Sequence, residues 1–211
     1  MRRVLMVLSG LILLLGSCEN FFTSSPLSFL QRDPSTLNDE QKRQFALDAL
    51  ASGDEDAMAA AYEALKDSTD PQTQLLAADL AVGATGLEGA VTETVAALSD
   101  GADVTDTLDD VLAGFTEEDF NRFQEAADLI NAADDTVQPT AEQYAFAAIG
   151  MLAVAANEAG DVGSVDPSDP SQPAAAEAEA LLQSSFDTLQ ASGESTDLIE
   201  ELGSVLGMTF P

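Results

Sequence analysis

The sequence contains no histidine and no tryptophan, and its 211 residues include one cysteine. Histidine supplies most acid–base catalysis near neutral pH, and histidine or cysteine ligates most protein-bound zinc. Nucleophilic sites that pair a cysteine with a histidine are excluded as well. Gly-rich phosphate loops, Gly-x-Ser-x-Gly elbows and Ser-x-x-Lys pairs are also missing. We therefore expect no catalytic residue, no metal ligand and no cofactor, and the chain is predicted not to be an enzyme.

Basic residues are almost as scarce. Seven lysines and arginines stand against 38 acidic residues, which gives a net charge of −31, and no basic residue follows Arg122. A surface of one negative sign repels phosphate backbones, so nucleic-acid binding is excluded. Hydrophobic residues nevertheless make up 45% of the chain and recur at helical spacing, which argues against disorder. The composition therefore predicts a folded, acidic domain.

The longest apolar run lies at the N-terminus. Arg2 and Arg3 precede the apolar residues 4–15, after which two small residues lead to the single cysteine. A helix needs about 20 apolar residues to span a bilayer, and this run is shorter. A basic start, a short apolar run and small residues are typical of a secretory signal peptide, which we predict over residues 1–17.

The junction Leu15-Gly16-Ser17-Cys18 resembles the lipobox of bacterial lipoproteins, in which an aliphatic residue and two small residues precede a cysteine. The resemblance implies lipidation of the Cys18 sulfur, signal cleavage between Ser17 and Cys18, and acylation of the new amino terminus. It also implies a cell-envelope location. Glu19 stands where an aspartate would retain a lipoprotein in the inner membrane, so the periplasmic face of the outer membrane is expected, or the extracytoplasmic membrane face in a cell without one. The alternative is an ordinary signal peptide followed by a chance cysteine.

Residues 18–37 form the predicted lipidated tether, and residues 38–211 the predicted all-α domain. Apolar residues at helical spacing recur between capping residues and glycines, and no segment alternates as a strand would. The most hydrophobic segment, residues 144–158, is predicted to be a central, buried helix. Predicted helix starts are Asn38, Asp54, Asp70-Pro71, Thr116-x-x-Asp119 and Thr140-x-x-Gln143.

Two packing arrangements are predicted within this domain. Phe45, Leu47 and Leu50 recur at helical spacing and predict the buried stripe of the first helix. The apolar positions of residues 108–115 and 120–130 predict two helices that form a hairpin.

A shift of 33 residues superposes small and apolar positions of two successive segments. We therefore predict repeats at residues 41–70 and 74–103. The superposed pairs include Leu47 with Leu80, Gly53 with Gly86, Tyr62 with Val95, and Leu65 with Leu98.

The stretch from Gly53 to Asp70-Pro71, with Tyr62 and Ala64-Leu65, resembles the second half of a tetratricopeptide repeat. That resemblance implies antiparallel helical hairpins stacked as a short α-solenoid. An irregular helical bundle is the alternative.

Two sets of residues are candidate binding groups. Carboxylates available for calcium are Asp161, Asp166 and Asp169, or Asp100, Asp103 and Asp106, although neither set has the spacing of an EF-hand loop. Aromatic residues that either line a pocket or, as the favoured interpretation, pack in the core are Phe120, Phe123, Tyr144 and Phe146.

These observations support two hypotheses of function. The first is a membrane-anchored envelope lipoprotein whose helical-repeat domain is a protein-interaction or assembly module, with the bilayer and another envelope protein as partners. The alternative is a solute-binding accessory subunit of an envelope transport system. A solute carrier should contain a cavity of about 300 Å³ or more lined by the aromatics, whereas an interaction module should have a filled interior.

Overall fold

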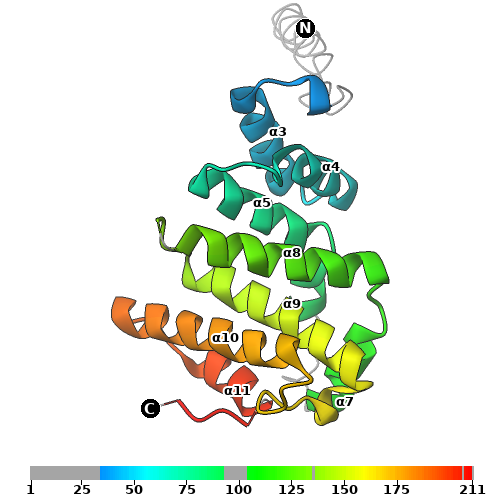
Figure 1. Cartoon of the computed structure of the whole chain (residues 1–211), viewed down its shortest axis with the longest axis vertical. Coiled ribbons are helices and arrows are strands. Elements are labelled where there is room, and N and C mark those ends of the chain that lie inside the picture. Colours follow the sequence, from blue (N-terminus) through cyan, green and yellow to red (C-terminus); the bar gives the residue numbers. More distant parts are fainter. Residues whose placement is uncertain (1–33, 93–103, 135, 206, 211) are drawn as a thin grey trace, which may run out of the picture. The chain divides into compact units, whose positions relative to one another are not determined.

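The computed structural model describes residues 34–92, 104–134, 136–205 and 207–210 (Figure 1). The chain divides into two compact units, residues 1–37 and residues 38–211. In the first unit the described residues form a short 3₁₀-helix, η1 (Pro34–Thr36).

The second unit is helical, and its described residues contain no strand. Its elements are α3 (Asp39–Ser52), α4 (Glu55–Leu65), α5 (Pro71–Gly83), α7 (Val104–Leu112), α8 (Glu117–Asp134), α9 (Ala141–Ala159), η2 (Val162–Ser164), α10 (Pro173–Ser192) and α11 (Asp197–Val205). Residues 87–92 are helical as well. The all-α class predicted from the sequence is therefore confirmed. Among the helices of the described ranges, none combines the length and the apolar character that a membrane crossing requires.

Polar side chains begin several of these helices at the predicted positions. In α3 and α9, the capping residue and the glutamine three residues later exchange hydrogen bonds with each other's backbone N–H groups. Each such capping box satisfies two backbone donors that a helix start leaves open. The side chains that accept a backbone N–H three residues later at a helix start, with or without a full capping box, are Asn38, Asp54, Asp70, Thr116 and Thr140.

Two of the residue pairs superposed by the 33-residue shift give different results. Gly53 ends α3 with φ 64°, and Gly86 precedes the helical residues 87–92 with φ 72°. Both glycines therefore occupy the left-handed region that L side chains rarely adopt. Leu47 and Leu80 are not equivalent, because Leu47 is 52% exposed and Leu80 is fully buried. The superposed pairs that involve residues 93–103 lie outside the described residues.

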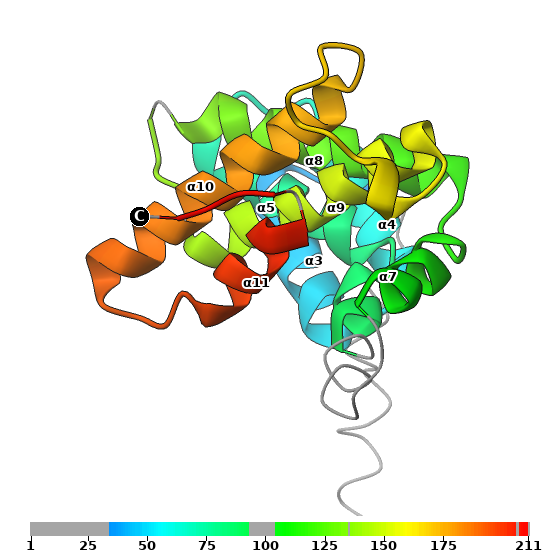
Figure 2. The same cartoon turned by 90° about the horizontal axis from the view of Figure 1, so that it is seen from below.

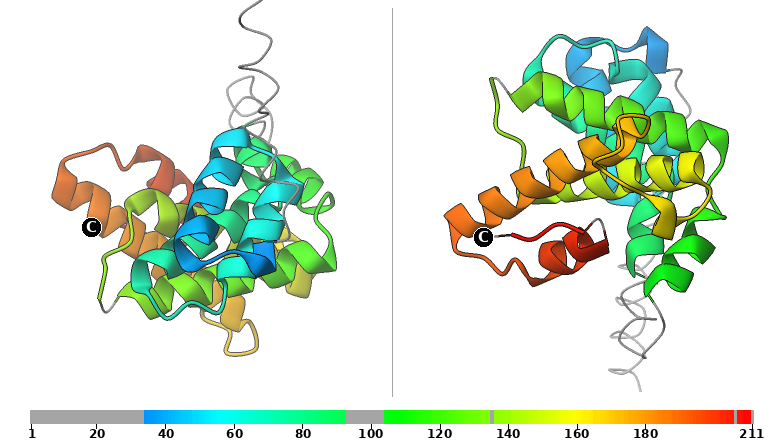
Figure 3. Two further views of the ribbon diagram at one scale, coloured as in Figure 1. Left: turned by 90° about the horizontal axis from the view of Figure 1, so that it is seen from above. Right: turned by 60° about the horizontal axis from the view of Figure 1, so that its bottom comes forward.

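Helices that follow one another in the chain pack side by side through most of this unit (Figure 1). The order of contacts is α3, α4, α5, α8, α9, α10 and α11. The left panel of Figure 3, seen from above, shows α3 and α4 (blue to cyan) in front of the other helices, and both contact α5. At the other end, α11 lies against α10 (Figure 2). The Phe186 ring of α10 stacks on the Phe210 ring near the C-terminus, with 4.5 Å between the ring centroids.

The helix α9 lies at the centre of the packing. It contacts α5, α7, α8, α10 and η2, and ten of its side chains or backbone positions from Tyr144 to Ala156 are buried. The prediction of a central, buried helix at residues 144–158 is confirmed. Its small residues allow close approach: a Cβ at Gly150 would lie 2.8 Å from Cδ1 of Phe123 on α8.

The buried face of α3 differs from the predicted stripe. Phe45, Ala46 and Ala49 are buried, Leu50 is half-buried and Leu47 is 52% exposed. Successive helical residues are rotated by about 100°, so the two alanines and Phe45 share a side that Leu47 does not. The small alanine side chains let neighbouring helices approach this side of α3. The prediction that Leu47 is a core residue is wrong, because its side chain faces away from that side.

The predicted hairpin of residues 108–115 and 120–130 is also wrong. The helix α7 packs mainly on α9 and η2, whereas α8 packs on α5 and α9. Leu108 of α7 contacts Ala156 and Val162, so the connection after α9 is tied to the core by a buried valine. The side chain of Asp109 accepts the backbone N–H of Val162 at 3.0 Å and fixes the same junction.

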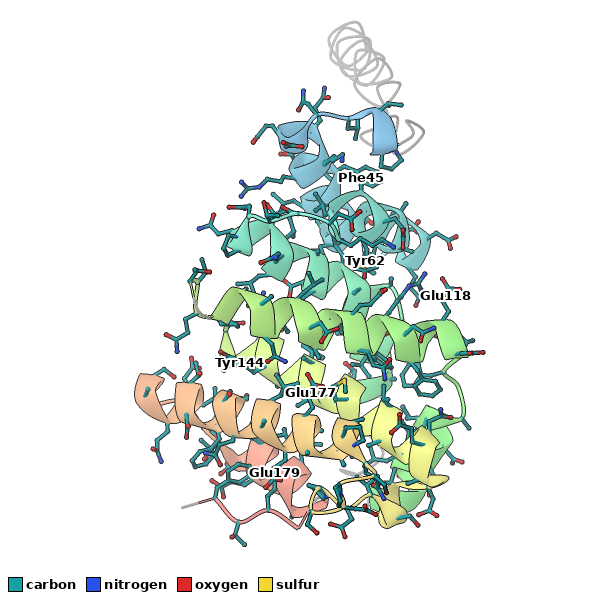
Figure 4. All side chains as sticks on the ribbon, in the orientation of Figure 1. Phe45, Tyr62, Glu118, Tyr144, Glu177 and Glu179 are labelled. Atoms are coloured by element: carbon teal, nitrogen blue, oxygen red, sulfur yellow. The ribbon has the colours of Figure 1, made fainter. Side chains whose placement is uncertain are left out.

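The contacts of α8 with α4 and α9, which we call the α8 contact region, combine apolar packing with a polar contact between α4 and α8. The hydroxyl of Tyr62 on α4 (labelled in Figure 4) donates to the Glu125 carboxylate on α8, with 2.5 Å between the oxygens. Burial raises the pKa of Tyr62 above its ordinary value, and the Glu125 carboxylate adds to the shift. Lys66 lies over the Tyr62 ring, with Nζ 5.7 Å from the ring centroid. The acidic Glu125 and the basic Lys66 therefore both lie next to Tyr62 in this region.

Candidate functional site

A cleft of about 840 Å³ is lined by α5, the start of α9, the α3–α4 turn and residues 86–92. Its floor is apolar and is formed by the buried side chains of Met58, Ala78, Val82 and Ile130. Phe146 and Leu50, both half-buried, extend this apolar surface. The cleft lies wholly within residues 38–211, and we call it the α5–α9 cleft.

The backbone of α5 comes close to Met58 at this floor. A Cβ at Gly83 would lie 2.5 Å from the Met58 sulfur. Because Gly83 has no side chain, Met58 can lie against the helix backbone and form part of the floor. The methionine side chain is unbranched and flexible, so this part of the surface can adapt to what contacts it.

One carboxylate reaches the floor. Asp79 lies on α5 among apolar neighbours, and Nε2 of Gln143 on α9 donates to both of its oxygens at 3.0 Å. Burial raises the pKa of the Asp79 carboxyl to about 6. The hydrogen bond from Gln143 opposes this rise, and the negative charge of Glu142 adds to it. Desolvation is therefore only partly compensated, and the charged form of Asp79 is held at a cost in free energy.

The Gln143 amide is oriented by a second hydrogen bond. Its Oε1 accepts the backbone N–H of Thr140 at 3.0 Å, which completes the capping box at the start of α9. The oxygen is thereby used by the helix start, and the nitrogen points to Asp79. A capping pattern that is readable in the sequence thus also positions a donor in the cleft.

The rim of the cleft is acidic and exposed. Glu55 lies in the first turn of α4, Glu88 lies in the helical residues 87–92, and Glu142 lies in the first turn of α9. All three are solvent-exposed. Among the described residues that line the cleft there is no lysine or arginine. The arrangement therefore offers an apolar floor, one partly buried carboxylate and three exposed ones, which suits a ligand with a cationic group and an apolar part.

The aromatic candidates fall in two places. Phe123 and Tyr144 are buried, and Phe123 makes edge-to-face contacts with Phe115 and Phe120 at centroid distances of 5.2 Å and 6.4 Å. Phe146 alone among the four candidates lines the α5–α9 cleft. The interpretation as core residues is therefore right for Phe123 and Tyr144, and a pocket-lining role fits Phe146.

The acidic candidates do not form a metal centre within the described residues, where no cluster of three potential ligands occurs. Asp161, Asp166 and Asp169 instead accept hydrogen bonds from serine hydroxyls three or two residues ahead. Asp106 belongs to α7.

The other predicted residues cannot be placed. Ser17 and Cys18 lie outside the described residues, and so do Asp100 and Asp103.

Sequence reasoning missed Asp79 as a site residue. Asp79 is the single acidic residue of α5, and it sits between apolar residues at positions 75–78 and 80–82. A lone acid inside an apolar helix is the signal that could have identified it.

Comparison with protein-family models, with curated proteins and with solved structures finds no match to this chain.

Proposed function

We propose that this chain is a membrane-anchored bacterial envelope lipoprotein whose helical domain is a protein-interaction or assembly module. The α5–α9 cleft is the binding surface in this proposal. Cys18 carries the acyl chains, and the domain stands at the periplasmic face of the outer membrane, or at the extracytoplasmic membrane face of a cell without one. The lipobox-like residues Leu15 to Cys18 support the anchor.

The observation that carries the interaction role is the form of the cleft. Its rim comes from three separate segments, the start of α4, residues 86–92 and the start of α9, and its glutamates are exposed. Its floor is apolar, and Met58 and Phe146 are among the residues that line it. A polar rim around an apolar centre is how protein-binding surfaces are built.

The finer architecture that we propose is a tetratricopeptide-like repeat. In this proposal, α3 with α4 forms one hairpin, and α5 with the helix beginning at residue 87 forms the next. The positive φ angles of Gly53 and Gly86 at matching positions support it. Stacked hairpins of this kind leave an extended surface that suits segments of partner proteins.

The alternative function is a solute-binding accessory subunit of an envelope transport system. The volume of about 840 Å³ favours this alternative, because it falls within the range of small-molecule sites. A small molecule that remains bound during native mass spectrometry of the protein purified from its envelope, and is lost in Phe146→Ser, would support the alternative over a protein partner.

Photo-crosslinking in the native envelope tests the interaction role. A photoreactive amino acid at Glu88 on the rim should give a defined crosslinked protein, whereas the same residue at the exposed Glu179 of α10 should not (Figure 4). The absence of any product specific to Glu88 would contradict the proposal.

The anchor has a test of its own. Cys18→Ser should leave the signal uncut or release the protein from the membrane fraction. An unmodified Cys18 in the mass spectrum of the mature protein would contradict the lipoprotein assignment.

A further inference from the structure

The charges of the α5–α9 cleft have one sign. Asp79 lies at the floor, and Glu55, Glu88 and Glu142 lie on the rim. The basic side chains that pair within the described residues do so elsewhere: Lys66 with Glu63, and Arg122 with Glu118 and Asp119. An occupant that carries positive charge would therefore meet complementary groups and no repelling lysine or arginine on the described lining.

Asp79 has capacity for a further donor. A carboxylate offers about four lone-pair positions, and the side-chain partner of Asp79 within the described residues is the single nitrogen of Gln143. The exposed Asp187 makes the same kind of contact with Gln183 on α10 at 2.8 Å, and its remaining lone pairs face solvent. Asp79 is less exposed than Asp187, so a bound cation would supply part of what solvent supplies to Asp187.

We propose that the α5–α9 cleft binds a segment of a partner protein in which a lysine or arginine is flanked by apolar residues. The cation pairs with Asp79, and the apolar neighbours pack on Met58 and Phe146. This inference rests on the interaction function proposed above and gives the chemistry of its partner.

The cleft suits the long stem of a basic residue. Lysine and arginine carry three or four methylene groups that pack on apolar surface while the charged end reaches a polar group. The buried side chains of Met58, Val82 and Ile130 supply that apolar surface beside Asp79. A charge-assisted hydrogen bond to a partly desolvated carboxylate is stronger than one formed in water.

A protein segment fits the rim better than a free small molecule does. Small-molecule sites enclose most of the ligand, whereas here the rim glutamates come from three segments and remain exposed. These glutamates can contact residues on either side of the inserted basic side chain. The occupant is therefore a chain that continues beyond the cleft.

Selection from a random displayed-peptide library tests this chemistry without a guess at the partner. The mature full-length protein is the bait, at physiological salt, and Asp79→Asn is selected in parallel. The selected peptides should share a lysine or arginine next to apolar residues. A selected peptide should bind Asp79→Asn about tenfold or more weakly, because it loses a hydrogen bond between charged groups.

The matched control is Asp187→Asn, which removes the same charge from the same kind of aspartate–glutamine pair outside the cleft. It should change the affinity by less than about twofold, because long-range charge effects are screened at physiological salt. Equal losses in both variants would mean nonspecific attraction to an acidic surface and would overturn the inference. It would be overturned as well by a selection without binders, or by binders without a basic residue.

Competition identifies the class of occupant. Cadaverine, a small diamine, should compete with the selected peptide only at far higher concentration. If cadaverine competes as strongly as the peptide, the occupant of the cleft is a small organic cation, and the inference of a protein segment is overturned. If the crosslink from Glu88 captures a protein but Asp79→Asn leaves that crosslink unchanged, the interaction function stands and the cation inference fails.

Discussion

The α8 contact region and the α5–α9 cleft are built from the same ingredients, an apolar surface and a carboxylate, but with opposite results. On α8, the Phe123 ring packs against the backbone at Gly150, and no space is left for a Cβ. In the cleft, a comparable apolar surface borders an open volume of about 840 Å³. One surface is used by the fold, and the other is left for a ligand.

The two carboxylates differ in the same way. Glu125 accepts a hydrogen bond from the Tyr62 hydroxyl, and two positive side chains, Lys66 and Arg122, lie in the same region. Asp79 has an amide partner and, as its charged neighbour, the like-charged Glu142. Lys66 interacts electrostatically with Glu125, and Arg122 does so with the Tyr62 hydroxyl that Glu125 accepts. The Asp79 carboxylate in the cleft therefore lacks the nearby positive charge that the fold provides around Glu125.

The largest effect is expected at Tyr62. Tyr62→Ala should lower the free energy of unfolding by about 3–5 kcal/mol, because it removes a large buried ring and leaves a cavity. Tyr62→Phe keeps the ring and loses the hydrogen bond to Glu125, so about 1 kcal/mol is expected. Urea denaturation measures both. Equal losses would mean that the hydrogen bond, and not the packing, stabilises the α8 contact region.

At Asp79 a substitution is expected to raise the free energy of unfolding instead of lowering it. Asp79→Asn should raise the free energy of unfolding at neutral pH by up to about 3 kcal/mol, since the pKa in the folded protein is about 6 and the ordinary value is 3.8. The side-chain oxygen of the substituted asparagine would still accept the hydrogen bond from Gln143.

The pH dependence of this gain follows from the raised pKa. Below pH about 4 the carboxyl is protonated in both states, so the folded wild-type protein suffers no penalty. As the pH rises from about 4 to 6, the unfolded state loses its proton first, and stability falls until it levels off above the folded pKa. The difference between the Asp79→Asn and wild-type unfolding curves should therefore grow over this window. A constant difference would contradict a buried, titrating Asp79.

Gly150 and Gly89 provide a matched pair of substitutions. Gly150→Ala should destabilise by about 1–3 kcal/mol, because the new Cβ would meet the Phe123 ring at 2.8 Å. Gly89 lines the cleft within the helical residues 87–92 and has no atom within 4 Å of an added Cβ, so Gly89→Ala should stabilise by up to about 1 kcal/mol. Thermal or urea unfolding of both variants tests whether one surface is closed and the other open.

The smallest expected effect concerns the two capping boxes. Thr140→Ala and Asn38→Ala should each cost about 1 kcal/mol of stability, because each removes a side-chain acceptor from a helix start. Only Thr140→Ala should also weaken the binding of a selected peptide, because fraying of the first turn of α9 would displace Gln143 even though the Thr140 backbone N–H is kept. Equal binding by both variants would separate the cap from the cleft.

Helix starts could be predicted from the sequence because they depend on a few neighbouring residues. Asn38 and Thr140 each form a capping box with a glutamine three residues later, and these contacts are local. The glycine turns at Gly53 and Gly86 are local for the same reason. Alanine made the buried faces harder to predict, because Ala46 and Ala49 carry little hydrophobic signal and still define the core side of α3.

The cleft could not be predicted, because its parts come from distant positions. Asp79 and Gln143 are 64 residues apart, and nothing in either local sequence indicates that they meet. Phe146 was one of four aromatic candidates, and its spacing did not distinguish it from Phe123, which is fully buried. The volume between α5 and α9 depends on how closely these helices approach, which is a property of their packing.

The two hydrogen bonds of the Gln143 amide link helix fraying to occupancy of the cleft. A cation that binds the remaining lone pairs of Asp79 keeps this carboxylate charged, so Nε2 of Gln143 stays bonded to it while Oε1 stays on the Thr140 backbone N–H. The amide is then held at both ends, and the first turn of α9 gains rigidity. Amide hydrogen exchange at Thr140 would consequently report on a ligand that never touches that N–H.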